Sequence, residues 1–130
     1  MIFMTRGFAL AQEPIATKGN YLHIYDFRVV PGREEEFIRL FDAFDYSKDN
    51  PMHKSAAQVK DGVLCRDVAD PGRFYLIAEW SDIGEHARIR RILAEEIRPE
   101  FVSLIEGRQF VPRYAEVVSS TPQETLKTAD

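Results

Sequence analysis

The chain has 130 residues, of which 45% are hydrophobic and 12% aromatic, and it carries a formal net charge of −4 at pH 7. This size and composition are typical of one domain with a buried core and exclude a second domain. The acidic balance, with an isoelectric point near 5.4, excludes a basic surface for nucleic acid or anionic membrane. No apolar run reaches the roughly 18–20 residues of a membrane span. A single cysteine excludes an intramolecular disulfide and any site of several thiolates.

The first residues resemble an export signal only in part. Ala9-Leu10-Ala11 has the small-residue pattern of a cleavage site, but Arg6 splits the apolar stretch before it and leaves that stretch too short. We therefore predict a cytoplasmic protein in which residues 1–19 form an N-terminal extension.

Residues 21–30 predict the first strand, because they are rich in β-forming residues and alternate between two faces. Pro31-Gly32 ends this strand. Three glutamates then start a helix, where their negative charge meets the positive end of the helix dipole. The helix is predicted to run to about residue 46, and it buries an aromatic-rich stripe made of Phe37, Leu40, Phe41 and Phe44.

A hairpin is predicted in the middle of the chain. Residues 56–68 form its first strand, in which Gly62 marks either a bulge or a tight turn. Asp70-Pro71-Gly72 is a turn sequence, because proline fixes φ and glycine accepts angles that other residues avoid. The turn joins the strand to a third one over residues 73–80.

A second helix is predicted over residues 83–97. Asp82 and Glu85 form a capping box at its start. Pro99 prevents its continuation. Its inward side chains are expected to be Ile89, Leu93 and Ile97.

Residues 109–118 predict the last strand. Pro112 removes one ladder donor, so this strand should lie at a sheet edge or carry a bulge. The polar residues 119–130 are expected to form a flexible C-terminal tail. The domain itself therefore spans residues 20–118.

The order of these elements is β-α-β-β-α-β, which is the ferredoxin-like arrangement of the α+β class. It places two helices on one face of a four-stranded antiparallel sheet. The other face is too apolar for water and too polar for a dry core, so we predict that a second sheet covers it in a symmetric homodimer. The residues expected on this face are Leu22, Ile24, Tyr75, Ile77, Val111 and Val117, with Asp26, Arg28, Glu79 and Arg113.

Three motifs carry a resemblance to a known family. They are the stretch Val-Pro-Gly-Arg-Glu-Glu-Glu-Phe at residues 30–37, Arg66-Asp67 before Asp70-Pro71, and the strand from Arg73 that ends at Trp80-Ser81-Asp82. Over residues 20–118 the chain resembles the antibiotic biosynthesis monooxygenase-like (ABM) family of dimeric α/β barrels. The resemblance implies this fold and a homodimer. Members include cofactor-free oxygenases of phenols and quinols, haem-degrading proteins, and proteins without an assigned role.

The haem-degrading branch does not fit the residues of this chain. Its members share an asparagine late in the first strand, a tryptophan at the end of the third, and a histidine along the second helix. Trp80 matches, but Tyr25 stands at the asparagine position and His86 lies at the start of the helix. The isolated histidines also lack the spacing of metal ligands. We therefore predict neither haem, nor a metal, nor another cofactor.

Cofactor-free oxygenation needs an electron-rich substrate, an apolar pocket, a base, and hydrogen-bond donors for reduced oxygen. His23 is the candidate base, with Tyr25 beside it on the same strand face and the indole N–H of Trp80 as a donor. Each also has a purely structural interpretation as a core residue. His86 faces solvent by default, although an inward turn would put it above Trp80. The remaining candidates for the ligand pocket are Phe27, Phe41 and His53.

The sequence thus leaves two functions open. One is a cofactor-independent monooxygenase that acts on a small phenolic or quinol-type compound. The other is a non-catalytic dimer that binds a small ligand or a protein. A deep pocket with polar atoms of the candidate residues would favour the enzyme. A pocket filled by aromatic and aliphatic side chains would favour the binding protein; those side chains are Phe37, Phe41, Phe44 and Ile89.

Overall fold

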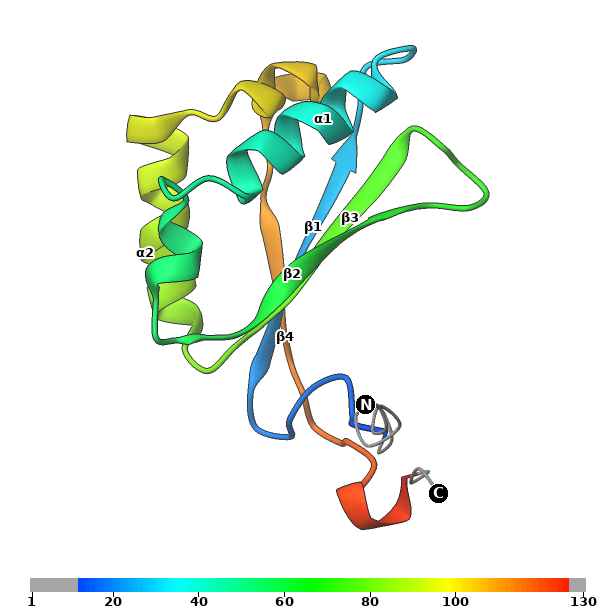
Figure 1. Ribbon diagram of the computed structural model, residues 1–130, viewed down its shortest axis with the longest axis vertical. Helices are drawn as coiled ribbons and strands as arrows, with labels where there is room; N and C mark the ends of the chain where they lie inside the picture. The colour runs from blue at the N-terminus through cyan, green and yellow to red at the C-terminus, as the bar shows by residue number, and fades with distance from the viewer. Residues whose placement is uncertain (1–11, 127–130) are drawn as a thin grey trace, which may run out of the picture.

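The structure is a computed structural model that describes residues 12–126. Predictions for residues 1–11, including the Ala9-Leu10-Ala11 pattern, and for residues 127–130 lie outside the described residues. Four strands form one antiparallel sheet in the order β2-β3-β1-β4 (Figure 1). The strands are β1 (Tyr21–Arg28), β2 (Gln58–Arg66), β3 (Arg73–Trp80) and β4 (Pro112–Glu116).

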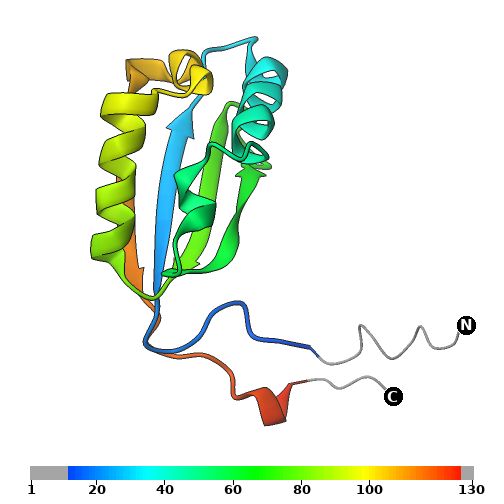
Figure 2. The same ribbon diagram turned by 60° about the vertical axis from the view of Figure 1, so that its left-hand side comes forward.

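Two α-helices lie on the same face of this sheet, α1 (Glu34–Asp45) and α2 (Ile83–Ile92) (Figure 2). The predicted ferredoxin-like fold is therefore confirmed. A π-helical turn, Leu93–Ile97, continues α2. Four short 3₁₀ helices complete the described elements: Pro51–Lys54, Glu100–Leu104, Glu106–Arg108 and Gln123–Thr125.

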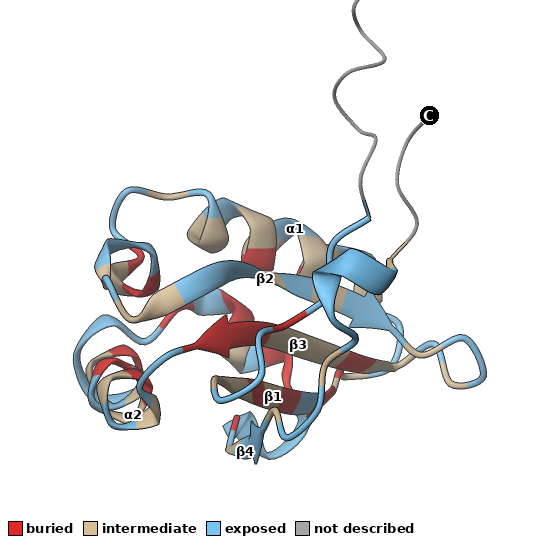
Figure 3. Ribbon diagram, turned by 90° about the horizontal axis from the view of Figure 1, so that it is seen from below, coloured by how far each residue is buried: buried red, intermediate tan, exposed pale blue. Residues whose placement is uncertain are grey.

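The alternation of β1 divides it between the two faces of the sheet. His23, Tyr25 and Phe27 are buried on the helix side, whereas Asp26 between them is exposed. Figure 3 shows that buried residues gather where β1 and β3 face the helices. One residue of strand slip would exchange these two sets, so the burial of one face fixes the register.

Helix α1 closes one end of the core through its aromatic stripe. Phe37 and Phe41 are buried, and Leu40 and Phe44 pack against the same cluster. Phe101 meets the rings of Phe37 and Phe41 edge to face, at centroid distances of 5.9 and 5.2 Å. This geometry suits the opposite charges of ring face and ring edge.

Helix α2 begins as predicted, because the Asp82 carboxylate accepts hydrogen bonds from the backbone N–H groups of Gly84 and Glu85, at 2.9 and 3.3 Å. The end of the helix differs from the prediction. Its last turn widens to a π-turn before Pro99, which lacks an N–H to continue the helix. The wider turn rotates Ile97 off the buried stripe, so the prediction that Ile97 faces inward was wrong: it is 38% exposed.

Two questions about the strands are settled. The pairing of β2 with β3 shifts register on both sides of Lys60, so the irregularity near Gly62 is bulged strand and not a turn. A Cβ at Gly62 would lie 3.0 Å from Leu76 Cδ1, which explains why no side chain is present there. Pro112 begins β4 at the edge of the sheet, as predicted.

Residues 12–20 and 117–126 run side by side at one end of the sheet (Figures 1 and 2). The backbone N–H of Thr17 and the side-chain amide of Asn20 donate to Glu79 Oε2 at 2.9 and 2.8 Å, on the face away from the helices. The boundaries predicted for the extension and the tail stay predictions. Within residues 12–126, no helix combines the length and apolar character needed to cross a membrane.

Candidate functional site

A cavity of about 50 Å³ lies between the sheet and the helices. That volume is several times the roughly 10–15 Å³ that one water needs, so it has room for a small water cluster. An aromatic ring needs roughly 150 Å³, so a ring enters only if lining side chains move. Five of the seven residues that the sequence singled out line it: His23, Tyr25, Phe27, Phe41 and His53. Trp80 and His86 do not line it and pack behind His23.

His23 is the most unusual residue of the cavity wall. It is 4% exposed, and neither ring nitrogen has a hydrogen-bond partner among the described residues. Burial, with a smaller contribution from the nearby His86, lowers the pKa of His23 to about 3. The imidazole is therefore neutral at pH 7, with one N–H to donate and one nitrogen lone pair to accept. It is a weak base, and both of its ring nitrogens are buried and unpaired beside the cavity.

His86 turns inward, so the expectation that it faces solvent by default was wrong. It stacks on His23 with ring centroids 4.3 Å apart and meets Trp80 edge to face at 5.0 Å. Its Nδ1 lies 2.8 Å from Tyr114 Oη and its Nε2 lies 3.3 Å from Tyr25 Oη. Burial first, and then the positive charge of Arg90, lower the pKa of His86 to about 4. His86 is therefore also neutral at pH 7.

Tyr114 is the residue of this cluster that the sequence did not single out. It lies opposite His23 in the pairing of β1 with β4. Only the strand register identifies it, because its neighbours in sequence are exposed polar or small residues. Tyr114 is 36% exposed and so connects the buried histidines to the surface.

Tyr25 and Trp80 differ in their access to the cavity. Tyr25 lines it, and burial raises the pKa of its hydroxyl above the usual value. Trp80 is fully buried in a separate cluster with Ile89 and Leu93, and its indole N–H has no partner among the described residues. Trp80 therefore supports the two histidines from behind and does not form the cavity wall.

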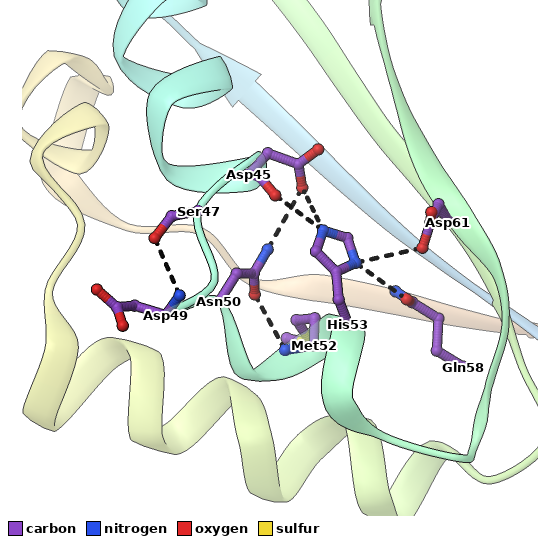
Figure 4. Close-up of polar contacts among 8 residues, drawn as sticks. All are labelled: Asp45, Ser47, Asp49, Asn50, Met52, His53, Gln58 and Asp61. Carbon is purple, nitrogen blue, oxygen red and sulfur yellow. Dashed lines mark hydrogen bonds and ion pairs between the residues drawn. The ribbon is translucent and has the colours of Figure 1, made fainter.

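His53 also lines the cavity, and Figure 4 shows the polar cluster around it. His53 Nε2 lies 2.9 Å from the Asp45 carbonyl oxygen and 3.2 Å from its carboxylate, and Nδ1 lies 3.2 Å from both Gln58 Oε1 and Asp61 Oδ1. Because both nitrogens face oxygens, the doubly protonated imidazolium fits best. Burial lowers the pKa of His53, but the bond to Gln58 and the negative charge of Asp45 and Asp61 outweigh it, so the net shift is upward.

Asn50 fixes the position of this polar cluster. Its side-chain oxygen accepts from the backbone N–H of Met52 at 3.0 Å, and its amide nitrogen donates to Asp45 at 3.4 Å (Figure 4). Burial raises the pKa of the Asp45 carboxyl, despite the opposing effect of His53. The cavity thus combines an apolar aromatic interior with the neutral His23, which His86 supports from behind, and with the hydrogen-bonded pair of His53 and Asp45.

No family model and no curated protein matches the chain. The fold nevertheless matches solved structures at 16–17% identity. A protein of Bordetella bronchiseptica, provisionally described as an antibiotic biosynthesis monooxygenase, aligns with a TM-score of 0.56 over 76% of this chain and 97% of its own. A NIPSNAP family protein of Agrobacterium tumefaciens aligns with a TM-score of 0.55 over 74% and 90%.

A dimeric ferredoxin-like protein from an uncultured marine organism aligns with a TM-score of 0.59, over 78% of this chain and 90% of its own. The resemblance noted in the sequence is therefore confirmed at the level of the fold. Because these neighbours carry different descriptions, the fold alone assigns no activity, and the function must be argued from the site.

Proposed function

We propose that the cavity binds a single-ring phenol or quinol and that the protein promotes its oxidation by O₂ without a cofactor. The observation that carries this proposal is His23, whose two unpaired ring nitrogens are buried beside an aromatic cavity. Leaving buried polar atoms unpaired costs roughly 1–3 kcal/mol. Because both nitrogens are buried, a phenolic hydroxyl would reach one of them only after a small movement of the His23 ring, and the new hydrogen bond would then recover part of that cost.

The reaction needs no external reductant, because the substrate supplies all the electrons. A phenol with a free para position and O₂ give a para-quinone and water: one oxygen atom forms the new C=O bond, and the other leaves as water with two hydrogens from the substrate. The protein has to orient the ring, hydrogen-bond its hydroxyl group, and exclude bulk water. The neutral His23 would donate its N–H to the hydroxyl oxygen and leave the hydroxyl proton to a separate acceptor, and the rings of Tyr25 and Phe41 provide apolar walls.

The size of the cavity makes one ring the upper limit for the substrate, and even one ring, which needs roughly 150 Å³, requires some movement of the lining side chains. Phe41, Phe44 and Phe101 line its wall and take part in the aromatic packing of α1, so a fused tricyclic phenol would require these side chains to move. We therefore expect hydroquinones and monocyclic phenols to be better substrates than anthrone-type compounds.

The assembly proposed for this activity is a homodimer through the sheet face away from the helices. Val63, Ile77 and Ile24 lie side by side across β2, β3 and β1 on that face. Val63 is 58% exposed, and a second sheet would cover this apolar row. The dimeric neighbour of the same fold supports self-association.

The test is oxygen uptake by purified, metal-stripped protein against a panel of hydroquinones, monocyclic phenols and anthrones. We expect uptake above the uncatalysed rate that persists with a chelator. Phenols with a free para position should give a quinone that carries one ¹⁸O atom from ¹⁸O₂, whereas a hydroquinone already carries both oxygens and should give an unlabelled quinone and H₂O₂. The His23→Phe variant should lose this activity, whereas Tyr75→Phe, on the opposite sheet face, should keep it. Uptake that is equal in wild type and His23→Phe would contradict the proposal.

The second candidate is a non-catalytic dimer that binds a small apolar ligand or a protein. The aromatic side chains that reduce the cavity to about 50 Å³ favour it. It predicts saturable binding of a monocyclic phenol without oxygen uptake, measured by calorimetry on the same samples.

A further inference from the structure

We propose that Tyr25, His86 and Tyr114 form a proton relay between the cavity and solvent. Tyr25 lines the cavity, His86 is fully buried behind it, and Tyr114 reaches the surface. Use of the relay in turnover rests on the proposed function, whereas its existence does not.

The three side chains form one continuous hydrogen-bonded chain. Tyr25 Oη lies 3.3 Å from His86 Nε2, and His86 Nδ1 lies 2.8 Å from Tyr114 Oη. The two hydroxyls thus occupy the two nitrogens of one ring, and each hydroxyl can either donate or accept. This hydrogen-bonded chain runs from Tyr25 on β1 through His86 on α2 to Tyr114 on the edge strand β4, on the helix side of the sheet.

A neutral imidazole between two hydroxyls has two equivalent ways to make both bonds. In one, Nδ1–H donates to Tyr114 and the Tyr25 hydroxyl donates to Nε2. In the other, Nε2–H donates to Tyr25 and the Tyr114 hydroxyl donates to Nδ1. The burial and the nearby positive charge that lower the pKa of His86 to about 4 keep the ring neutral at pH 7, as this exchange requires.

Moving one proton outward converts the first arrangement into the second. Tyr25 Oη takes the substrate proton and gives its own to Nε2, Nδ1–H passes to Tyr114, and Tyr114 releases its original proton to water. No charge remains on the chain. The reverse movement brings one proton back and restores the first tautomer.

This cycle matches the proton requirement of the proposed reaction. Deprotonation of the phenol sends one proton out, and formation of water from reduced oxygen takes one back. His23 alone cannot store the proton in between, because its pKa is about 3. The relay therefore carries the proton that His23, a weak base, cannot hold.

Arg90 supports proton movement along this chain. Its guanidinium is held by two hydrogen bonds to the Phe110 carbonyl oxygen, at 3.2 and 2.9 Å. Burial raises the pKa of Tyr25 and of Tyr114, and the positive charge of Arg90 counteracts this rise at both hydroxyls. The positive charge of Arg90 therefore stabilises a transient tyrosinate at either position.

A static role is the alternative: the two tyrosines would only satisfy the nitrogens of a buried histidine in one fixed tautomer. The ¹⁵N chemical shifts of His86 distinguish the two in substrate-free protein, because protonated and unprotonated ring nitrogens differ strongly. The relay predicts intermediate shifts at both nitrogens in wild type. Tyr114→Phe should move them toward the Nε2–H tautomer, whose N–H still donates to Tyr25, and Tyr25→Phe should move them toward the Nδ1–H tautomer, whose N–H still donates to Tyr114.

One fixed tautomer in wild type that is unchanged in Tyr114→Phe would overturn the relay. Tyr75→Phe is the matched control, since it removes a hydroxyl with one hydrogen bond, to Asp67, from the opposite sheet face. His86 shifts in this control should equal those of wild type.

The second measurement is turnover of the best phenol of the panel with a free para position. Tyr114→Phe should lower kcat by roughly tenfold or more, change KM by less than about twofold, and alter the solvent deuterium isotope effect on kcat. A Tyr114→Phe enzyme that behaves like Tyr75→Phe would overturn the use of the relay. Absence of uptake in wild type would instead contradict the proposed function, and the ¹⁵N shifts would still decide whether the relay exists.

Discussion

Replacing His23 with phenylalanine should stabilise the free protein while it destroys the site. His23 buries two unpaired ring nitrogens, and phenylalanine removes both while keeping a planar ring in the same place. The slightly larger ring can extend into the neighbouring cavity of about 50 Å³. Cores usually lose stability on such substitutions, so a gain would mark a residue retained for function.

The expected gain at pH 7.5 follows from the unpaired atoms. A buried donor or acceptor without a partner costs roughly 1–3 kcal/mol, and the strain of fitting the larger phenylalanine ring offsets part of this gain. We expect the free energy of unfolding of His23→Phe to exceed that of wild type by about 1–2 kcal/mol at pH 7.5.

The gain should grow as the pH falls. Unfolded His23 binds a proton below its ordinary pKa of 6.5, whereas the folded protein binds it only near pH 3. Between these values acidification favours the unfolded chain, so wild type loses stability as the pH falls below 6.5. At pH 5 the difference of 1.5 pH units corresponds to about 2 kcal/mol, so the total advantage of the variant becomes about 3–4 kcal/mol.

Urea unfolding at pH 7.5 and pH 5 measures both quantities, with the fluorescence of Trp80 as the probe. Wild type and variant must be compared at equal protein concentration, because association adds to apparent stability. A variant that is less stable than wild type at both pH values, by the same amount, would refute the account of His23.

Three further substitutions test other parts of the structure. Trp80→Phe should lower the free energy of unfolding by about 1–3 kcal/mol in urea titrations, and it should lower turnover less than about tenfold, since the ring supports the histidines without lining the cavity. A hundredfold loss in turnover would place Trp80 in contact with substrate. The pKa of His53, followed by NMR, should lie above 6.5 in wild type, so its contribution to stability is present below that pH and fades as the pH rises through the raised value. Asp45→Asn should lower this pKa, and an unchanged midpoint would contradict the ion pair. Gly62→Ala should destabilise the protein by about 1 kcal/mol in thermal unfolding, because its Cβ would meet Leu76 Cδ1 at 3.0 Å; a neutral result would show that Leu76 yields freely.

The fold followed from patterns that are local in sequence. Alternation in residues 21–30, the helical spacing of Phe37 and Phe41, and the Asp82 cap each specify an element with little help from the rest of the chain. The prediction failed at Ile97 because a helix end depends on how the chain leaves the helix. There, Arg98 adopts a left-handed conformation before Pro99.

The site was harder to predict because it depends on which residues meet across the sheet. His86 lies three and seven residues before Ile89 and Leu93, so the helical spacing already placed it on their buried stripe. Because histidine is polar, a histidine at such a position is predicted to face solvent unless its hydrogen-bond partners in the fold are known. Those partners are Tyr25 and Tyr114, which come from distant strands, and only the register brings them together.

The central claim is that the cavity beside His23 is a ligand site, and ¹⁵N NMR of the histidines under anaerobic titration with hydroquinone tests it most directly. The account predicts saturable shifts at the ring nitrogens of His23, and no saturable binding to the His23→Phe variant. Unchanged His23 shifts at saturating hydroquinone, in a protein that remains folded, would contradict it.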